Sequence, residues 1–155
     1  MKRLHKFVLL SQSQRNLLLS AATLMYAFRM GLWLLPFRTL ACLTEHFGSW
    51  SRAADALTAE RIAWSIQVAS RYVPKASCLV QALTAKILLQ SAGIPVRLHI
   101  GVAKMKGQPF EAHAWVETRG GVLIGGSELE RYAPLLVWER GSGCIGSARS
   151  AGVGE

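Results

Sequence analysis

The hydrophobic pattern of this chain changes its period once, at Pro95, and this change constrains the fold more than any other feature. Before Pro95, apolar residues recur at three- and four-residue steps, as on one face of an α-helix. After it, residues 96–102 and 110–117 alternate between apolar and polar side chains, as in half-buried β-strands. Helices followed by a small antiparallel sheet predict an α+β domain, and 155 residues suffice for one such core.

Helix start and stop signals define the helices of the segment before Pro95. They predict four helices, over residues 12–31, 36–47, 58–72 and 78–93. Ser11 and Gln14 fit a capping box at the first helix, and Val73-Pro74 ends the third.

Turn residues and composition indicate the last strand and the division of the chain into subdomains. A hairpin turn is expected at 118–121, before a last strand at 122–124. We therefore expect an N-terminal helical subdomain (1–50), a core (51–140) and a flexible tail (141–155) that contains five glycines.

The positive charge of the chain is concentrated at its N-terminal end. Lys and Arg number 18 against 9 Asp and Glu, a net +9, and residues 1–44 hold six basic residues and no acidic one. Such a segment suits nucleic acid, an anionic membrane surface or an acidic peptide, or simply keeps an apolar segment soluble. No RNP pattern, zinc-finger spacing or dense Lys/Arg block is present, so no nucleic-acid partner is expected.

Residues 16–37 are the one segment apolar enough to raise the question of a membrane span. Arg29, Gly31 and Pro36 interrupt it, and its longest uncharged run from Asn16 is short of the roughly 20 residues that a span requires. This pattern favours packed helices, with weak membrane-surface contact left open.

Acidic residues and cysteines limit the kinds of site. The only Asp is Asp55, which excludes sites built on paired aspartates such as an EF-hand. The three cysteines, Cys42, Cys78 and Cys144, are odd in number and widely spaced, which predicts neither a disulfide framework nor a zinc site.

The N-terminus does not fit a secretory signal. Only residues 7–10 form an apolar run after the basic start, whereas a secretory signal needs an apolar run of about 7–15 residues. A cytoplasmic protein without metal or cofactor is expected.

Cys78 and His113 are candidates for a nucleophile and its base. Cys78 opens a predicted helix, where unpaired N–H groups, the helix dipole and the nearby Lys75 favour a thiolate. The same N–H groups can bind an oxyanion when the thiolate attacks a carbonyl. A cysteine at a helix N-terminus with a histidine on a following strand is the arrangement of papain-like and transglutaminase-like enzymes. The structural alternative is a small buried thiol and a hydrogen-bonded core histidine.

The residues around this pair carry a more specific pattern. It consists of Ser77–Leu83, Leu88-Leu89, Ala92–Pro95, Ile100–Val102 and Phe110–Glu117. In this order the segments resemble the leader peptidase of lasso-peptide biosynthesis, a transglutaminase-like cysteine protease. The resemblance covers about residues 70–135, and the N-terminal helices look like those of the free-standing form of the family.

The resemblance implies a fold, a reaction and partners. The fold would be N-terminal helices packed on a papain/transglutaminase-like core, with a catalytic helix followed by a small antiparallel sheet. The protein would remove the leader from a ribosomally made precursor, with Cys78 forming a thioester acyl-enzyme and His113 acting as general base and then acid. The implied partners are the precursor leader peptide, a small leader-recognition protein and the ATP-dependent lasso cyclase.

The sequence departs from the family pattern at the third catalytic residue. The family has an Asp where this chain has Gly125. Glu111 is the tentative third member, with Glu117, Glu128, a backbone carbonyl or water as alternatives, and Gln81 is a tentative further site residue. The loss of the Asp need not abolish activity, because the nucleophile and base are the core of the mechanism. The alternative function is a non-catalytic module of peptidase fold that holds the precursor and maturation partners. A transglutaminase that joins side chains and releases ammonia is a third hypothesis.

Overall fold

The computed structural model describes residues 10–36, 39, 40, 42, 44, 56–103, 111–126 and 129–139 of the chain. The elements in order are α2 (Gln12–Leu34), α4 (Ala56–Ser70), α5 (Cys78–Ser91), β1 (Arg97–Ala103), β2 (Glu111–Thr118), β3 (Gly121–Ile124), the 3-10 helix η1 (Leu129–Arg131) and β4 (Ala133–Trp138). Helices precede an antiparallel sheet, so the predicted α+β class is confirmed.

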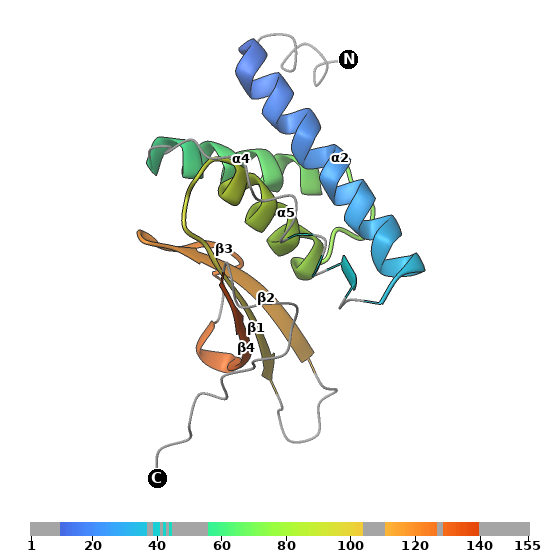
Figure 1. The fold of residues 1–155 in the computed structure, drawn as a ribbon, viewed down its shortest axis with the longest axis vertical. Helices are drawn as coiled ribbons and strands as arrows, with labels where there is room; N and C mark the ends of the chain where they lie inside the picture. The colour runs from blue at the N-terminus through green and yellow to red at the C-terminus, as the bar shows by residue number, and fades with distance from the viewer. Residues whose placement is uncertain are drawn as a thin grey trace.

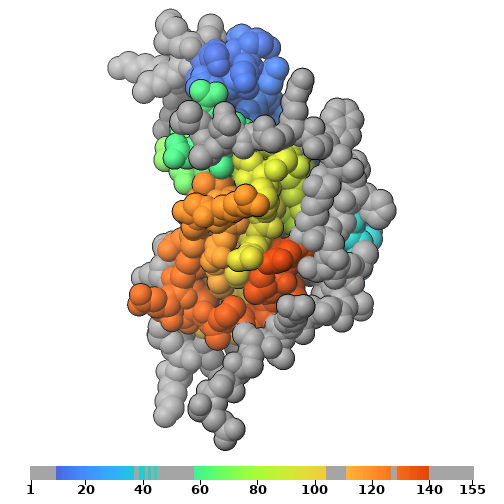
Figure 2. Space-filling model, turned by 60° about the vertical axis from the view of Figure 1, so that its left-hand side comes forward, coloured from blue at the N-terminus to red at the C-terminus, as the bar shows by residue number. Residues whose placement is uncertain are grey.

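The four strands form one antiparallel sheet in the order β3-β2-β1-β4. In Figure 1 the three helices gather on one side of this sheet, and α5 packs against β2 and against both other helices. Figure 2 shows α2 in blue at one end of the molecule and the orange strands toward the other, with the yellow α5 and β1 between them. The core therefore lies between α5 and the sheet, and the helix that begins at Cys78 is at its centre.

Helix α5 is buried around nearly its whole circumference, which is typical of a helix at the centre of a core. Ten of its fourteen residues are buried, and one of them is Lys86, which is fully buried. The Lys86 Nζ atom lies 3.1 Å from the centroid of the Trp138 ring, a cation–π contact between α5 and β4. Because α5 is held on all sides, its first residue has a fixed place in the fold.

Capping residues set the first residues of α2 and α5 as the sequence predicts, whereas α4 begins two residues earlier and ends two residues earlier than expected. Ser11 and Gln14 form the expected capping box at α2. Ser77 is the N-cap of α5, and its hydroxyl accepts a hydrogen bond from the Val80 N–H at 3.4 Å. Cys78 is therefore the first residue inside the helix.

Some predicted bounds differ from those of the structure. Helix α2 continues to Leu34 through Gly31, where a Cβ atom would lie 2.7 Å from a methyl carbon of Leu40, so glycine permits a close approach of that segment. Residues 39, 40, 42 and 44 of the second predicted helix are helical. Pro36, the first residue of that predicted helix, is not helical, and its other residues and the tail at 141–155 lie outside the described residues.

The two described cysteines are in different chemical states. Cys42 is disulfide-bonded, whereas Cys78 is a free thiol, and Cys144 lies outside the described residues. The disulfide at Cys42 departs from the expectation based on number and spacing, because pairing depends on Cα atoms lying within about 7 Å in space. Cys78 is therefore the thiol that this part of the chain offers for chemistry.

Helix α2 exposes one stripe of large apolar side chains, which we call the α2 stripe: Leu19, Tyr26, Met30 and Trp33. Their spacing of seven, four and three residues places them on one face, opposite the buried Ala21, Met25 and Phe28. By length and composition alone α2 could cross a membrane, and only 17% of its apolar window is buried inside the protein. This face is therefore available for contact with another molecule.

Candidate active site

Cys78 and His113 line one cavity of about 350 Å³, although they are 35 positions apart in the sequence. The N-terminus of α5 brings Cys78 and Leu79 to it, and strands β1, β2 and β4 bring the other lining residues, Ile100, Ala112, His113, Ala114, Leu135 and Leu136. Apart from Cys78 and His113, the lining side chains are all apolar. The fold thus brings the two predicted reactive residues to the same cavity.

The start of α5 offers unpaired hydrogen-bond donors next to the Cys78 thiol. The Val80 N–H is capped by Ser77, and the Gln81 N–H donates to the Ser77 carbonyl at 3.1 Å. Within the described residues the N–H groups of Cys78 and Leu79 make no hydrogen bond, as is usual in a first helical turn. These two donors can bind an anionic oxygen that forms beside the sulfur.

The imidazole of His113 is held by three neighbours. Its Nε2 atom lies 2.9 Å from the carbonyl oxygen of Gly125. The ring stacks with Tyr132, with centroids 4.9 Å apart, and with Trp115, with centroids 6.3 Å apart. The ring orientation is therefore defined by a hydrogen bond at one nitrogen and by aromatic faces on its sides.

No hydrogen bond joins the Cys78 thiol to the imidazole in the part of the chain that the structure describes. Catalytic hydrogen bonds of unliganded enzymes are often long and tighten when substrate binds. The arrangement therefore provides a thiol, an imidazole and two N–H donors around one cavity. A proton transfer from the thiol to the imidazole requires the two groups to approach each other.

Gln81 and Glu111, the two tentative site residues, do not line the cavity that contains Cys78 and His113. The Gln81 side-chain amide donates to the Ala76 carbonyl at 3.0 Å, so it anchors the segment that leads into α5. Glu111 is exposed at the start of β2, opposite Ala103, and among the described residues no hydrogen bond or ion pair joins it to His113. The roles proposed for both side chains stay predictions.

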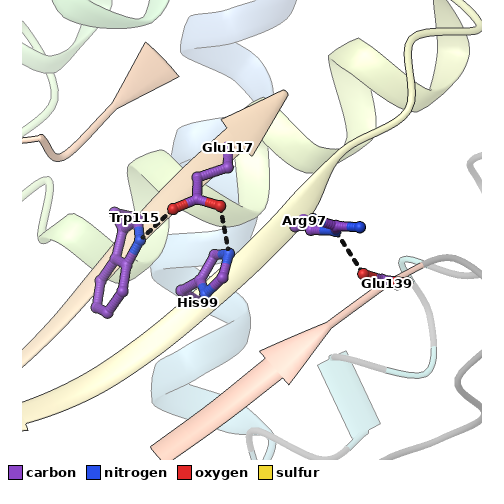
Figure 3. A network of polar contacts seen from close by, with 5 residues as sticks. All are labelled: Arg97, His99, Trp115, Glu117 and Glu139. Atoms are coloured by element: carbon purple, nitrogen blue, oxygen red, sulfur yellow. Dashed lines mark hydrogen bonds and ion pairs between the residues drawn. The ribbon is translucent and has the colours of Figure 1, made fainter. Parts of the chain in front are cut away.

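Glu117 belongs to a polar network at the other end of β2. Its carboxylate accepts a hydrogen bond from the Trp115 indole at 3.3 Å and lies 3.0 Å from His99 Nε2, as Figure 3 shows. The His99 ring stacks on Trp115 with centroids 5.1 Å apart, and Arg97 pairs with Glu139 beside it. The Glu117 carboxylate therefore contacts His99 and Trp115, not His113. Glu128, the other alternative for a third member, lies outside the described residues.

Strand β4 and Tyr132 contribute residues that the sequence analysis did not single out. Leu135 and Leu136 line the cavity, and Tyr132 stacks on the imidazole. The run of apolar residues at 135–138 was a usable strand signal. Within the described residues, no group of three or more His, Cys, Asp or Glu side chains could hold a metal ion.

Comparison with known proteins gives one match. A family model described as "Transglutaminase-like superfamily" matches residues 22–137, about three quarters of the chain. The matched region contains the cavity, with both Cys78 and His113, and all four strands except Trp138, the last residue of β4. No curated protein and no solved structure matches the chain.

Proposed function

The chain belongs to the transglutaminase-like superfamily, and we propose that it is a cysteine peptidase that removes the leader from a lasso-peptide precursor. The observation that carries this proposal is the shared cavity, where a free thiol on a helix N-terminus and an imidazole face one apolar space. The superfamily includes cysteine peptidases, and the choice of a lasso precursor rests on the motif resemblance around Cys78 and His113.

The proposed first step forms a thioester. His113 Nδ1 takes the proton of the Cys78 thiol, and the sulfur attacks the carbonyl carbon of the scissile amide. The N–H groups of Cys78 and Leu79 bind the resulting oxyanion. The imidazolium then donates its proton to the amine nitrogen, the C–N bond breaks, and the core peptide leaves with a free N-terminus.

The second step regenerates the enzyme. His113 takes a proton from a water molecule, and the hydroxide attacks the thioester carbonyl. The C–S bond breaks, the leader leaves with a new carboxylate, and the proton returns to the sulfur. Because Leu79, Ile100, Leu135 and Leu136 line the cavity, we expect the leader to present an apolar side chain next to the scissile bond.

The test uses the whole chain with a candidate precursor and its leader-recognition protein in heavy-oxygen water, followed by mass spectrometry. We expect a free core peptide and a leader whose new carboxylate carries one heavy oxygen atom. A cross-linked product with release of ammonia would show a transglutaminase instead. An intact precursor that stays bound to the chain would overturn the peptidase proposal.

That last outcome would support the second candidate, a non-catalytic module that holds the precursor and its partners. Two observations favour it: the thiol and the imidazole are not hydrogen-bonded to each other among the described residues, and position 125 carries no carboxylate. The same experiment separates the two candidates, because a module binds the precursor without forming any new carboxylate.

We further propose that the α2 stripe binds the leader-recognition protein. The stripe is exposed and apolar, and it contains Tyr26 and Trp33, residue types that often dominate the energy of protein interfaces. It belongs to a segment with six basic residues and no acidic one, so a second copy of the chain would be repelled and an acidic partner attracted.

Replacement of both Met30 and Trp33 by serine tests this surface. We expect cleavage that depends on the partner to fall about tenfold or more, since one interface anchor contributes about 2 kcal/mol or more. Cleavage of precursor without the partner should not change, and neither should the Tm, because both side chains are exposed. The matched control is Val122→Ser, an exposed apolar residue on β3.

Two results would contradict the partner proposal. One is an equal loss of cleavage with and without the partner. The other is unchanged partner binding together with lost binding to anionic phospholipid vesicles, which would assign the α2 stripe to a membrane surface instead.

A further inference from the structure

We propose that the backbone carbonyl of Gly125 takes the place of a third catalytic side chain, as the positioning group that prepares His113 to accept the Cys78 proton. The inference rests on the proposed cysteine peptidase function for its catalytic meaning. Its structural content, the ring orientation and tautomer of His113, can be measured without any activity.

The hydrogen bond between His113 and Gly125 determines which ring nitrogen is free. A carbonyl oxygen can only accept a hydrogen bond, so at 2.9 Å the Nε2 atom of His113 must be the donor. In a neutral imidazole only one nitrogen carries a hydrogen, and Nδ1 is then left as an acceptor. The Gly125 carbonyl therefore selects the tautomer whose Nδ1 can take a proton from a thiol.

The backbone at Gly125 is built so that the carbonyl, and not a side chain, meets the ring. Its φ angle is +78°, in the left-handed region that favours glycine. A Cβ atom there would lie 2.8 Å from the Ala114 carbonyl oxygen and 3.0 Å from Trp115 Cβ, so no side chain fits without displacing β2. A carboxylate at position 125 is thereby excluded.

The position of the Gly125 carbonyl follows from the pairing of β3 with β2. Gly125 directly follows β3, and Ile124 pairs with Val116 on β2, the strand that carries His113. The donor thus lies on β2 and the acceptor directly after β3, the strand that pairs with β2.

A carboxylate in a catalytic triad stabilises the positive charge of the protonated histidine, and aromatic rings next to His113 can supply part of that stabilisation. When His113 takes up a proton, its positive charge lies beside the stacked ring of Tyr132 and near that of Trp115. Such faces attract a cation through the ring quadrupole. The neutral carbonyl orients the ring, and the two aromatic faces stabilise its charged form.

The direct test is nitrogen NMR of the histidine side chains in the full chain, which contains only four histidines. The His113 signals are assigned by their absence in His113→Gln. We expect neutral His113 in the Nε2–H tautomer, with a proton protected from exchange with water. A dominant Nδ1–H tautomer, or a freely exchanging mixture, would overturn the proposal whether or not the protein cleaves a peptide.

Kinetics of two variants then test the catalytic meaning. Glu111→Gln removes the rival carboxylate at an exposed position, and we expect kcat and KM within about twofold of the wild type. Gly125→Ala should lower kcat by about 10²–10⁴-fold, the scale for a misoriented catalytic histidine, with a much smaller change in KM and loss of the Nε2–H signature.

Gly125→Ala can also fail to fold, because of the predicted clash with β2. In that case Glu111→Gln and the NMR measurement still decide the question. A loss of about 100-fold in kcat in a folded Glu111→Gln protein would assign the positioning role to Glu111 and reject Gly125.

Discussion

Replacement of Cys78 by alanine is expected to abolish cleavage of the precursor, with a loss of about 10⁵–10⁶-fold in the single-turnover rate. The physical reason is that no other thiol lines the cavity among the described residues, so the acyl-enzyme cannot form. The fold should survive, because the thiol is only partly buried and alanine suits the first turn of a helix. Mass spectrometry of precursor, leader and core measures the effect.

Cys78→Ser is the matched control for this experiment. It keeps the size and the polar character of the side chain but replaces the thiol by a much weaker nucleophile, so cleavage should also be lost while precursor binding remains. Trapping of a thioester between leader and wild-type chain, absent in both variants, would identify the nucleophile directly. Cleavage that persists in Cys78→Ala would disprove the mechanism.

Replacement of His113 by glutamine is expected to lower kcat by at least about 10³-fold, since the base and acid of both chemical steps is removed. Alkylation of Cys78 by iodoacetamide at neutral pH should slow as well, because the imidazole no longer takes the thiol proton. This second readout is independent of any substrate. It also shows whether the thiol and the imidazole approach each other in solution, although no hydrogen bond joins them in the described structure.

His99→Gln provides the control for His113→Gln. Both imidazoles stack on Trp115, but His99 pairs with Glu117 and does not line the cavity. We expect its effect on kcat to stay within a few-fold. Equal losses in the two variants would mean that the column of stacked rings, and not base catalysis, explains the effect of His113.

Local patterns in the sequence predict most of the elements that build the cavity. The N-cap Ser77 and the buried run that follows predict α5 from Cys78 onward, because capping and helical periodicity act within a few residues. The two-residue alternation likewise predicts β1 and β2, with Ala114 and Val116 in the core. Agreement is best where a short segment carries its own signal.

Strand β4 shows where such local signals are insufficient. Pro134 lies inside it, and a proline argues against a strand because it cannot donate a ladder hydrogen bond. The proline is tolerated because β4 is the last strand in the order β3-β2-β1-β4 and pairs only with β1. An edge position depends on the whole sheet and cannot be read from residues 133–138 alone.

The same limit applies to the partner of His113. Cys78 and His113 could be chosen as candidates from the sequence, because a cysteine at a helix start and a histidine on a strand are visible as residue types in a pattern. A backbone carbonyl has no such signature, since every residue carries one, and the search for a third side chain led to Glu111. The carbonyl that meets the ring is chosen by the pairing of β2 with β3 and by the positive φ of Gly125.

The sequence alone therefore determined the α+β class, the elements from α5 to β3 and the two candidate residues Cys78 and His113, because all of these follow from periodicity and chemistry within short segments. The tertiary structure alone decided that Cys78 and His113 share a cavity, that β4 closes part of it and that Gly125 holds the imidazole. These features are distances between residues far apart in the chain, and only the packing of α5 on the sheet brings those residues together.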